Sequence, residues 1–156
     1  MSAALQPGDA APDFDLPADG DGRVSLVDFK GKALVLYFYP KDDTTGCTNE
    51  AKGFAEAADA FAKAGVAVVG VSKDSVKSHD RFKAKYALNF PLGSDPDGAV
   101  VEAYGVWVEK SLYGRKYMGI DRSTFLIGAD GKIARVWRKV KVGGHVAEVL
   151  SAVQAL

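Results

Sequence analysis

A strand–helix–strand pattern in the first half of the chain constrains the fold more than any other feature. Two short, continuously apolar segments, 33–39 and 66–71, are rich in β-branched and aromatic residues. Such runs without alternation are typical of strands covered on both faces of a parallel sheet. Between them, over 47–64, apolar residues recur at three- and four-residue steps, as in an amphipathic helix. This order predicts a βαβ unit with a right-handed crossover.

The second half of the chain continues the alternation. A helix is predicted over 75–86, capped by Asp74 or Ser75. A short strand over 90–92 precedes a short helix that starts at Asp95-Pro96 and closes at Gly105.

Two hairpins and a final helix complete the pattern. Asp130-Gly131 between the β-rich runs 123–127 and 133–137 indicates a hairpin, and a second hairpin is expected to join 14–16 to 23–26. A last helix is predicted over 146–156. The element order predicts an α/β fold, a three-layer α/β/α sandwich with a mixed central sheet, in a single domain over 1–156.

Composition narrows the classes of partner. Lysine plus arginine equal aspartate plus glutamate, 20 against 20, so the chain lacks the basic excess that a nucleic-acid binder needs. No run of about 18 apolar residues occurs, so we expect no membrane span. Residues 1–11 predict a short flexible lead-in and no signal peptide. A single cysteine excludes an intramolecular disulfide and suits a reducing, cytoplasmic location.

The chemically interesting position is Cys47, at the predicted start of the helix that follows the first buried strand. Sites in open α/β sheets lie at the carboxyl ends of strands. Unpaired backbone N–H groups and the helix dipole stabilise an anion there, and a thiolate is such an anion. The placement therefore predicts an activated, nucleophilic cysteine.

Two residues of the same loop have alternative interpretations. The hydroxyl of Thr44 can face the sulfur or an oxygen bonded to it, or it can cap the helix. Pro40 can shield the sulfur from water, or it is simply a turn proline.

The stretch Tyr37 to Glu50, YFYPKDDTTGCTNE, resembles the active-site segment of peroxiredoxins, and most of all that of peroxiredoxin Q, or bacterioferritin comigratory protein. The family pattern Pro-x-x-x-Thr-x-x-Cys is met by Pro40, Thr44 and Cys47. A second segment, 119–127, resembles the family's arginine-bearing strand and gives that role to Arg122. The resemblance covers nearly the whole chain and implies a thioredoxin-like fold.

The resemblance also implies an activity, a thiol peroxidase for hydrogen peroxide and alkyl hydroperoxides that needs no cofactor. Cys47 would attack a peroxide oxygen and become a sulfenic acid. Arg122 and Thr44 would bind the peroxide and stabilise the moving negative charge, while Pro40 limits water access. Glu50 would orient Arg122; on the residues alone it equally fits a carboxylate that favours the helix N-terminal turn.

One departure from the family pattern decides how the Cys47 sulfenic acid must be reduced back to the thiol. Many peroxiredoxin Q proteins carry a resolving cysteine five residues after the nucleophile or on the next helix, and these positions here are Lys52 and about Lys83. Resolution therefore needs an external thiol: thioredoxin, glutaredoxin, glutathione or a small dithiol. The resemblance favours a monomer, with a dimer as the alternative.

Other classes of function stay open at this point. A peroxide sensor with little turnover would use the same cysteine, whereas an inert relic need not retain Pro40, Thr44, Cys47 and Arg122 together. Dithiol exchange within the chain is excluded, because Thr44 occupies the first position of a Cys-x-x-Cys motif.

The remaining polar candidates receive ordinary interpretations. His79 and His145 are expected at the surface or at helix ends, and no zinc-ligand spacing exists, so no metal is expected. Asp42 and Asp43 are expected to be solvated or capping residues. The segment 107–114 is expected to be a loop with exposed aromatic residues. It is either part of a satellite hydrophobic cluster or, as in similar proteins, a border of the peroxide entry or a dimer contact.

Overall fold

The computed structural model describes residues 4–156, so the first three residues of the predicted lead-in lie outside it. The strands are β1 (Asp15–Ala18), β2 (Gly22–Ser25), β3 (Ala33–Phe38), β4 (Val66–Ser72), β5 (Leu92–Ser94), β6 (Trp107–Leu112), β7 (Arg115–Ile120), β8 (Ser123–Ile127) and β9 (Ile133–Trp137). The helices are α1 (Thr45–Glu56), α2 (Ala58–Lys63), α3 (Val76–Tyr86), α4 (Ala99–Ala103) and α5 (His145–Gln154), with a 3-10 turn, η1 (Leu26–Phe29).

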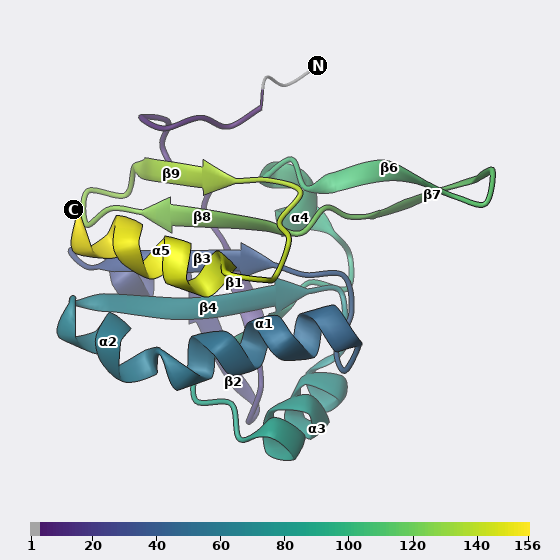
Figure 1. Ribbon diagram of the computed structural model, residues 1–156, viewed down its shortest axis with the longest axis horizontal. Coiled ribbons are helices and arrows are strands. Elements are labelled where there is room, and N and C mark those ends of the chain that lie inside the picture. Colours follow the sequence, from purple (N-terminus) through teal and green to yellow (C-terminus); the bar gives the residue numbers. More distant parts are fainter. Residues whose placement is uncertain (1–3) are drawn as a thin grey trace.

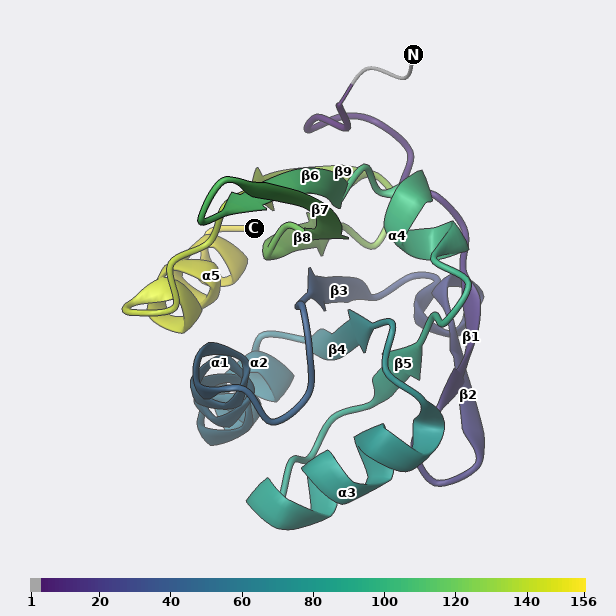
Figure 2. The same ribbon diagram turned by 90° about the vertical axis from the view of Figure 1, so that its right-hand side faces the viewer.

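The described residues form one mixed sheet of seven strands in the order β2-β1-β5-β4-β3-β8-β9 (Figure 1). The central strands β3, β4 and β5 run parallel, whereas β8 pairs antiparallel with β3. Helices α1, α2, α3 and α5 lie on one side of the sheet and α4 lies on the other (Figure 2). The predicted three-layer α/β/α sandwich with a mixed sheet is confirmed.

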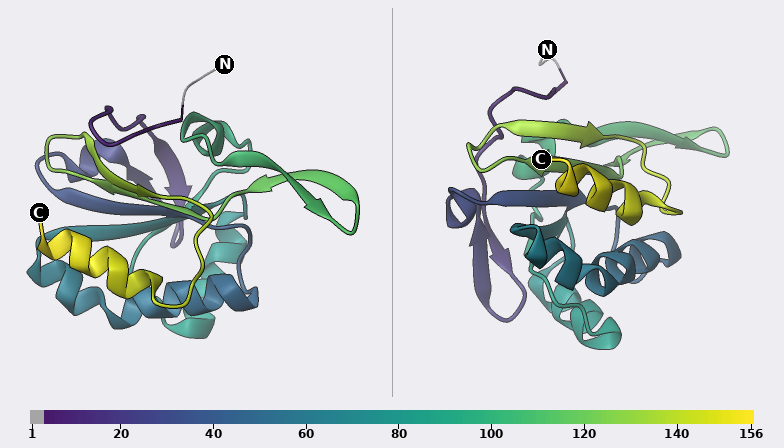
Figure 3. Two further views of the ribbon diagram at one scale, coloured as in Figure 1. Left: turned by 45° about the horizontal axis from the view of Figure 1, so that its top comes forward. Right: turned by 60° about the vertical axis from the view of Figure 1, so that its left-hand side comes forward.

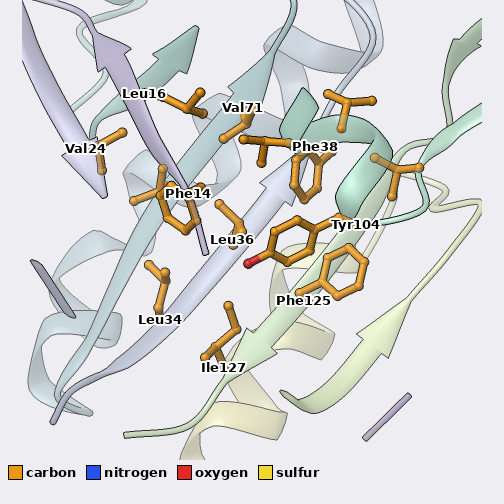
Figure 4. Packing of buried hydrophobic residues seen from close by; sticks show 14 of the residues in the cluster. Phe14, Leu16, Val24, Leu34, Leu36, Phe38, Val71, Tyr104, Phe125 and Ile127 are labelled. Carbon is orange, nitrogen blue, oxygen red and sulfur yellow. The ribbon is translucent and has the colours of Figure 1, made fainter. Parts of the chain in front are cut away.

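Each face of the sheet has its own apolar core. On the α4 side, Leu36 and Phe38 of β3 pack with Tyr104 and Phe125, and the rings of Phe38 and Phe125 meet edge-on with centroids 5.8 Å apart (Figure 4). On the other side, Tyr37 of β3 stacks on Phe54 of α1 at 4.7 Å. Because β3 contributes alternate side chains to both cores, its carboxyl end is held firmly at the centre of the molecule.

The predicted helix over 47–64 is two helices. The helix starts at Thr45 and leaves helical geometry at Ala57, whose dihedral angles are φ −89° and ψ 3°, before α2 begins. The hydrophobic pattern continues across Ala57, with Phe54 and Phe61 on the same buried side. For this reason periodicity alone did not predict the break.

Three other predictions about local structure also differ from the structure. The short helix does not begin at Pro96: it begins at Ala99 after Gly98, and Asp95 accepts the N–H of Val101 at 2.8 Å. The expected loop over 107–114 is strand β6, which pairs with β7 as an arm projecting beyond the sheet (Figure 3). The short strand also lies slightly later than expected, at Leu92–Ser94.

Tyr113 and Gly114 form the tip of the β6–β7 arm, and both have positive φ, 52° and 77°. Positive φ at both central residues suits a two-residue hairpin turn, but tyrosine is an unusual residue there. The hairpin signal was therefore weak in the sequence. Within residues 4–156, no helix is both long and apolar enough to cross a membrane.

Candidate active site

Cys47 lies in the first turn of α1, just beyond the carboxyl end of β3. Thr44 is the N-cap residue, and the N–H of Thr48 donates the first helical bond to the Thr44 carbonyl at 2.8 Å. The N–H of Cys47 therefore belongs to the first turn, whose N–H groups have no acceptor within the helix. The Cys47 side chain is 1% exposed. The sulfur thus lies at the positive end of a helix dipole and away from bulk water.

Arg122, which lies 75 residues after Cys47 in the sequence, contacts this sulfur. Because β8 runs antiparallel to β3 with Ser123 opposite Phe38, the residue before β8 lies beside the loop that follows β3. The Arg122 Nη2 donates to Cys47 Sγ at 3.3 Å. A side chain at Gly46 would place its Cβ 3.1 Å from that same nitrogen, so the glycine leaves room for the guanidinium.

Glu50, one helical turn after Cys47, completes the cluster. Arg122 Nη1 donates to Glu50 Oε1 at 2.7 Å, and Glu50 is 0% exposed. Its other oxygen, Oε2, has no hydrogen-bond partner among the described residues. Burial raises the pKa of Glu50 from 4.5 to about 7, although the charge and hydrogen bond of Arg122 oppose the rise. For Arg122 itself, burial is outweighed by Glu50 and Cys47, which raise the guanidinium pKa.

Two predicted site residues lie in the loop but make no side-chain hydrogen bond to the sulfur in the described part of the chain. The Thr44 hydroxyl donates to the Lys41 carbonyl at 3.0 Å and makes no side-chain cap bond to α1. Pro40 is exposed at the end of β3. Of the five residues predicted for the site, the structure therefore brings Cys47, Arg122 and Glu50 into direct contact.

A second polar cluster at the same loop was missed. Asp42 is 7% exposed and His79 is 0% exposed, which contradicts the expected solvated turn and surface histidine. Asp42 Oδ2 and His79 Nδ1 lie 2.7 Å apart. The available signal was that His79 shares a helix face with the apolar residues Phe82 and Tyr86, a face that packs inward.

His145, the other histidine, is the first residue of α5, at a helix end as expected, but it is buried against Thr124 and Trp137. Its Nε2 is 2.8 Å from the Thr124 hydroxyl. Burial lowers its pKa, with a smaller contribution from Arg122 in the same direction and an opposing one from Glu148. Within the part of the chain that the structure describes, no group of three or more acidic, histidine or cysteine residues is placed to hold a metal ion.

Comparison with known proteins gives consistent matches. Residues 7–136 match the model of the AhpC/TSA family. The chain is 56% identical to a putative peroxiredoxin bcp of Coxiella burnetii over 147 residues, 94% of this chain and 97% of that protein. It is 47% identical to the peroxiredoxin Bcp of Bacillus subtilis over 150 residues, 96% of each chain.

Solved structures agree with this fold. The bacterioferritin comigratory protein of Xanthomonas campestris, studied for its alkyl peroxide reduction activity, superposes with a TM-score of 0.89 at 44% identity, covering 99% of this chain and 98% of that one. A cysteine variant of PrxQ from Xylella fastidiosa gives a TM-score of 0.93 at 42% identity, with coverage of 99% and 98%.

Proposed function

The chain belongs to the AhpC/TSA family, in its peroxiredoxin Q or bacterioferritin comigratory protein branch, and is a thiol peroxidase; we propose that Cys47 is its peroxidatic nucleophile. The observation that carries the proposal is the Arg122 Nη2 donor 3.3 Å from Cys47 Sγ, at the N-terminus of α1. A guanidinium and a helix dipole both favour a thiolate over a thiol.

The first chemical step follows from this geometry. The Cys47 thiolate attacks the terminal oxygen of a hydroperoxide, so an S–O bond forms while the O–O bond breaks. The leaving hydroxide or alkoxide takes a proton and departs as water or an alcohol. Cys47 is oxidised to a sulfenic acid and the peroxide is reduced. Because negative charge moves along the S–O–O axis, donors fixed beside the sulfur stabilise the transition state more than the ground state.

The neighbours of Cys47 have distinct proposed roles. Arg122 holds the peroxide and the developing charge, and the 2.7 Å ion pair with Glu50 orients its fork. The N–H of Cys47 supplies a second donor. Thr44, whose hydroxyl donates to the Lys41 carbonyl, turns toward the bound peroxide. Pro40 limits water access from the end of β3.

An external thiol completes the cycle, because the chain has one cysteine. The thiol condenses with the sulfenic acid to give a mixed disulfide and water, and a second thiol releases reduced Cys47 and a disulfide. The two positions where relatives can carry a resolving cysteine are Lys52, which is exposed, and Lys83, whose ammonium pairs with Asp19 at 2.7 Å. We propose thioredoxin, glutaredoxin or glutathione as reductant, and a cytoplasmic monomer as the working form.

The test combines trapping and turnover. Reduced protein receives one equivalent of hydrogen peroxide in the presence of a sulfenic-acid-specific nucleophile, and mass spectrometry locates the adduct. We expect it at Cys47 and expect none in Cys47→Ser. Sustained peroxide consumption with excess thioredoxin, glutaredoxin or glutathione then identifies the reductant through its mixed disulfide. An adduct at another residue would contradict the proposal. So would the failure of Cys47 to form a mixed disulfide with any of the thiols tested.

A further inference from the structure

His79 lies at the centre of a buried hydrogen-bond network that the peroxidase chemistry does not use. Its Nδ1 is 2.7 Å from Asp42 Oδ2, and its Nε2 is 2.9 Å from the Gly93 carbonyl of β5. Asp42 also accepts hydrogen bonds from the hydroxyls of Tyr39 at 2.5 Å and Ser78 at 2.8 Å. The side chain of His79 is 0% exposed, so water does not substitute for any of these partners.

The hydrogen-bond partners of His79 favour its protonated state. An ionised carboxylate and a backbone carbonyl can only accept hydrogen bonds, so both ring nitrogens must donate. Only the imidazolium has two N–H donors. Burial disfavours that charge, but the hydrogen bond and charge of Asp42 outweigh burial, and the pKa of His79 is raised from 6.5. The network therefore contains a buried ion pair between His79 and Asp42.

This ion pair anchors the loop that carries the nucleophile. Asp42 lies two residues before Thr44, the N-cap of the Cys47 helix. Its N–H donates to Asp74 Oδ2 at 2.9 Å, so both its backbone and its side chain are held from the β4–α3 side. The next residue, Asp43, has a φ of 60° and accepts from Tyr86 at 2.6 Å and Lys85 at 2.8 Å.

A non-glycine residue in left-handed geometry persists only when its surroundings hold it there. Those surroundings are the side chains of α3. The loop between Pro40 and Cys47 is thus fixed by α3 on one side and by the start of α1 on the other. On the α3 side, His79 is the one partner in which a proton can be gained or lost near neutral pH.

We infer that His79 is a positioning residue for the peroxidatic site: as an imidazolium it holds Asp42, and through Asp42 the loop that sets Cys47 against Arg122. The inference rests on the proposed function of Cys47. The groups that face His79 are Asp42 from the loop, Tyr39 from the end of β3, Asp74 and Ser78 from the β4–α3 region, and Gly93 from β5. The two charged groups among them are carboxylates, so they favour the imidazolium together.

Deprotonation of His79 removes one of its two donors, so either Asp42 or the Gly93 carbonyl loses the hydrogen bond that the ring supplies. The loop then loses one of its anchors. We therefore expect the rate constant of Cys47 with hydrogen peroxide to fall on an alkaline limb set by His79. Glu50, whose pKa is about 7, also titrates near neutral pH, so the limb assigned to His79 is the one that disappears in His79→Gln. Displacement of a nucleophile by a fraction of an ångström up to about 1 Å costs roughly 10- to 100-fold in rate.

The test follows the rate constant against pH in the wild type, His79→Gln and the double variant Asp42→Asn/His79→Gln. His145→Gln is the matched control, because His145 is equally buried but bonds Thr124 outside the loop. We expect His79→Gln to be roughly tenfold or more slower and to lack the alkaline limb. The neutral double variant should recover part of the rate but should lack the alkaline limb. His145→Gln should retain the alkaline limb.

Two measurements keep the inference testable if His79→Gln does not fold. Nitrogen-15 NMR of the wild-type ring reports whether both nitrogens are protonated at neutral pH. The protection of the amides of 41–47 against hydrogen exchange, corrected for the intrinsic pH dependence, should fall as the ring loses its proton. A neutral His79 at pH 7 would overturn the inference. So would a folded His79→Gln with the wild-type rate and pH profile, or one in which amide exchange of the loop is unchanged. A wild type no faster than free cysteine would instead contradict the proposed function.

Discussion

Two ion pairs, one in the loop before Cys47 and one beside its sulfur, differ in how completely their hydrogen bonds are satisfied. In the Asp42–His79 pair, both carboxylate oxygens and both ring nitrogens have partners. In the Glu50–Arg122 pair, one carboxylate oxygen lacks a partner among the described residues, and one guanidinium nitrogen donates to sulfur. The first pair joins elements of the scaffold, whereas the second faces the reacting atom.

The difference indicates which pair can change during the proposed reaction. A fully satisfied buried network is rigid, and a partly satisfied one retains unused hydrogen-bonding capacity at a cost in stability. The raised pKa of Glu50, about 7, reflects that cost. In the proposed reaction, a peroxide at Cys47 accepts hydrogen bonds from Arg122, whose counter-charge, Glu50, can change. The loop before Cys47, held by Asp42 and His79, is the rigid part of the site.

The largest expected effect comes from breaking the satisfied pair. Asp42→Ala leaves His79 buried without its counter-charge, and such losses cost about 3–5 kcal/mol. Urea unfolding at about pH 6 is the measurement, because the pKa of His79 is raised above 6.5. The stabilisation is fully present below pH 6.5 and is lost as pH rises through the raised value. The apolar double variant Asp42→Ala/His79→Leu should recover most of the loss; a single-variant loss under about 1 kcal/mol would contradict the ion pair.

The next effect comes from the pair that faces the sulfur. Arg122→Met removes a charged donor beside Cys47 Sγ, and loss of one such donor lowers a rate by roughly 10²–10³-fold. Stopped-flow oxidation by hydrogen peroxide measures it. Arg122→Lys is the matched control, because it keeps the charge without the two-pronged geometry and should recover only part of the rate. Equal rates in Arg122→Met and the wild type would remove Arg122 from the site.

The Glu50–Arg122 pair should differ from the Asp42–His79 pair in how the free energy of unfolding depends on pH. The pKa of Glu50 is raised from 4.5 to about 7 in the folded protein, so the folded state binds the proton more tightly. Its contribution to stability is therefore present below pH 4.5 and is lost as pH rises to about 7, by an amount on the order of 3 kcal/mol. Urea unfolding between these pH values should show this fall in the wild type and not in Glu50→Gln. The same slope in both proteins would assign it to another group.

The smallest effect is expected at an exposed pair, which calibrates the buried ones. Arg23 Nε and Asp15 Oδ1 are 3.0 Å apart, but both side chains are more than half exposed. Arg23→Ala should change the free energy of unfolding by less than about 1 kcal/mol, and added salt should weaken the contribution further. A loss as large as that of Asp42→Ala would show that burial does not separate the two kinds of pair.

Much of the fold could be predicted because its strongest signals are local. β3 and β4 are continuous apolar runs, and Asp130-Gly131 marks the β8–β9 turn. The β6–β7 arm could not be predicted in the same way, because its strands are largely exposed and Tyr113 occupies a turn position that favours asparagine or glycine. The break at Ala57 was hidden by a hydrophobic pattern that continues through it.

In the site, too, the residues marked by local sequence patterns could be predicted, whereas those that depend on tertiary packing could not. Cys47 and Arg122 were identified from their segments, and the pairing of β3 with β8 explains why segments 75 residues apart meet. The orientation of Thr44 toward Lys41 is set by a loop conformation that residue types do not encode. Asp42 looked like a turn residue because its partner, His79, lies 37 positions away. Burial of a polar pair depends on tertiary packing, which no local pattern reports.

The most direct test of the account is the rate at which Cys47 reacts with hydrogen peroxide. Reduced protein is mixed with peroxide in a stopped-flow instrument, Trp107 and Trp137 fluorescence is followed, and free thiol is titrated in parallel, with Cys47→Ser as control. We expect a rate constant far above that of free cysteine, which disappears in the control and falls in Arg122→Met. A Cys47 that reacts no faster than free cysteine would contradict it.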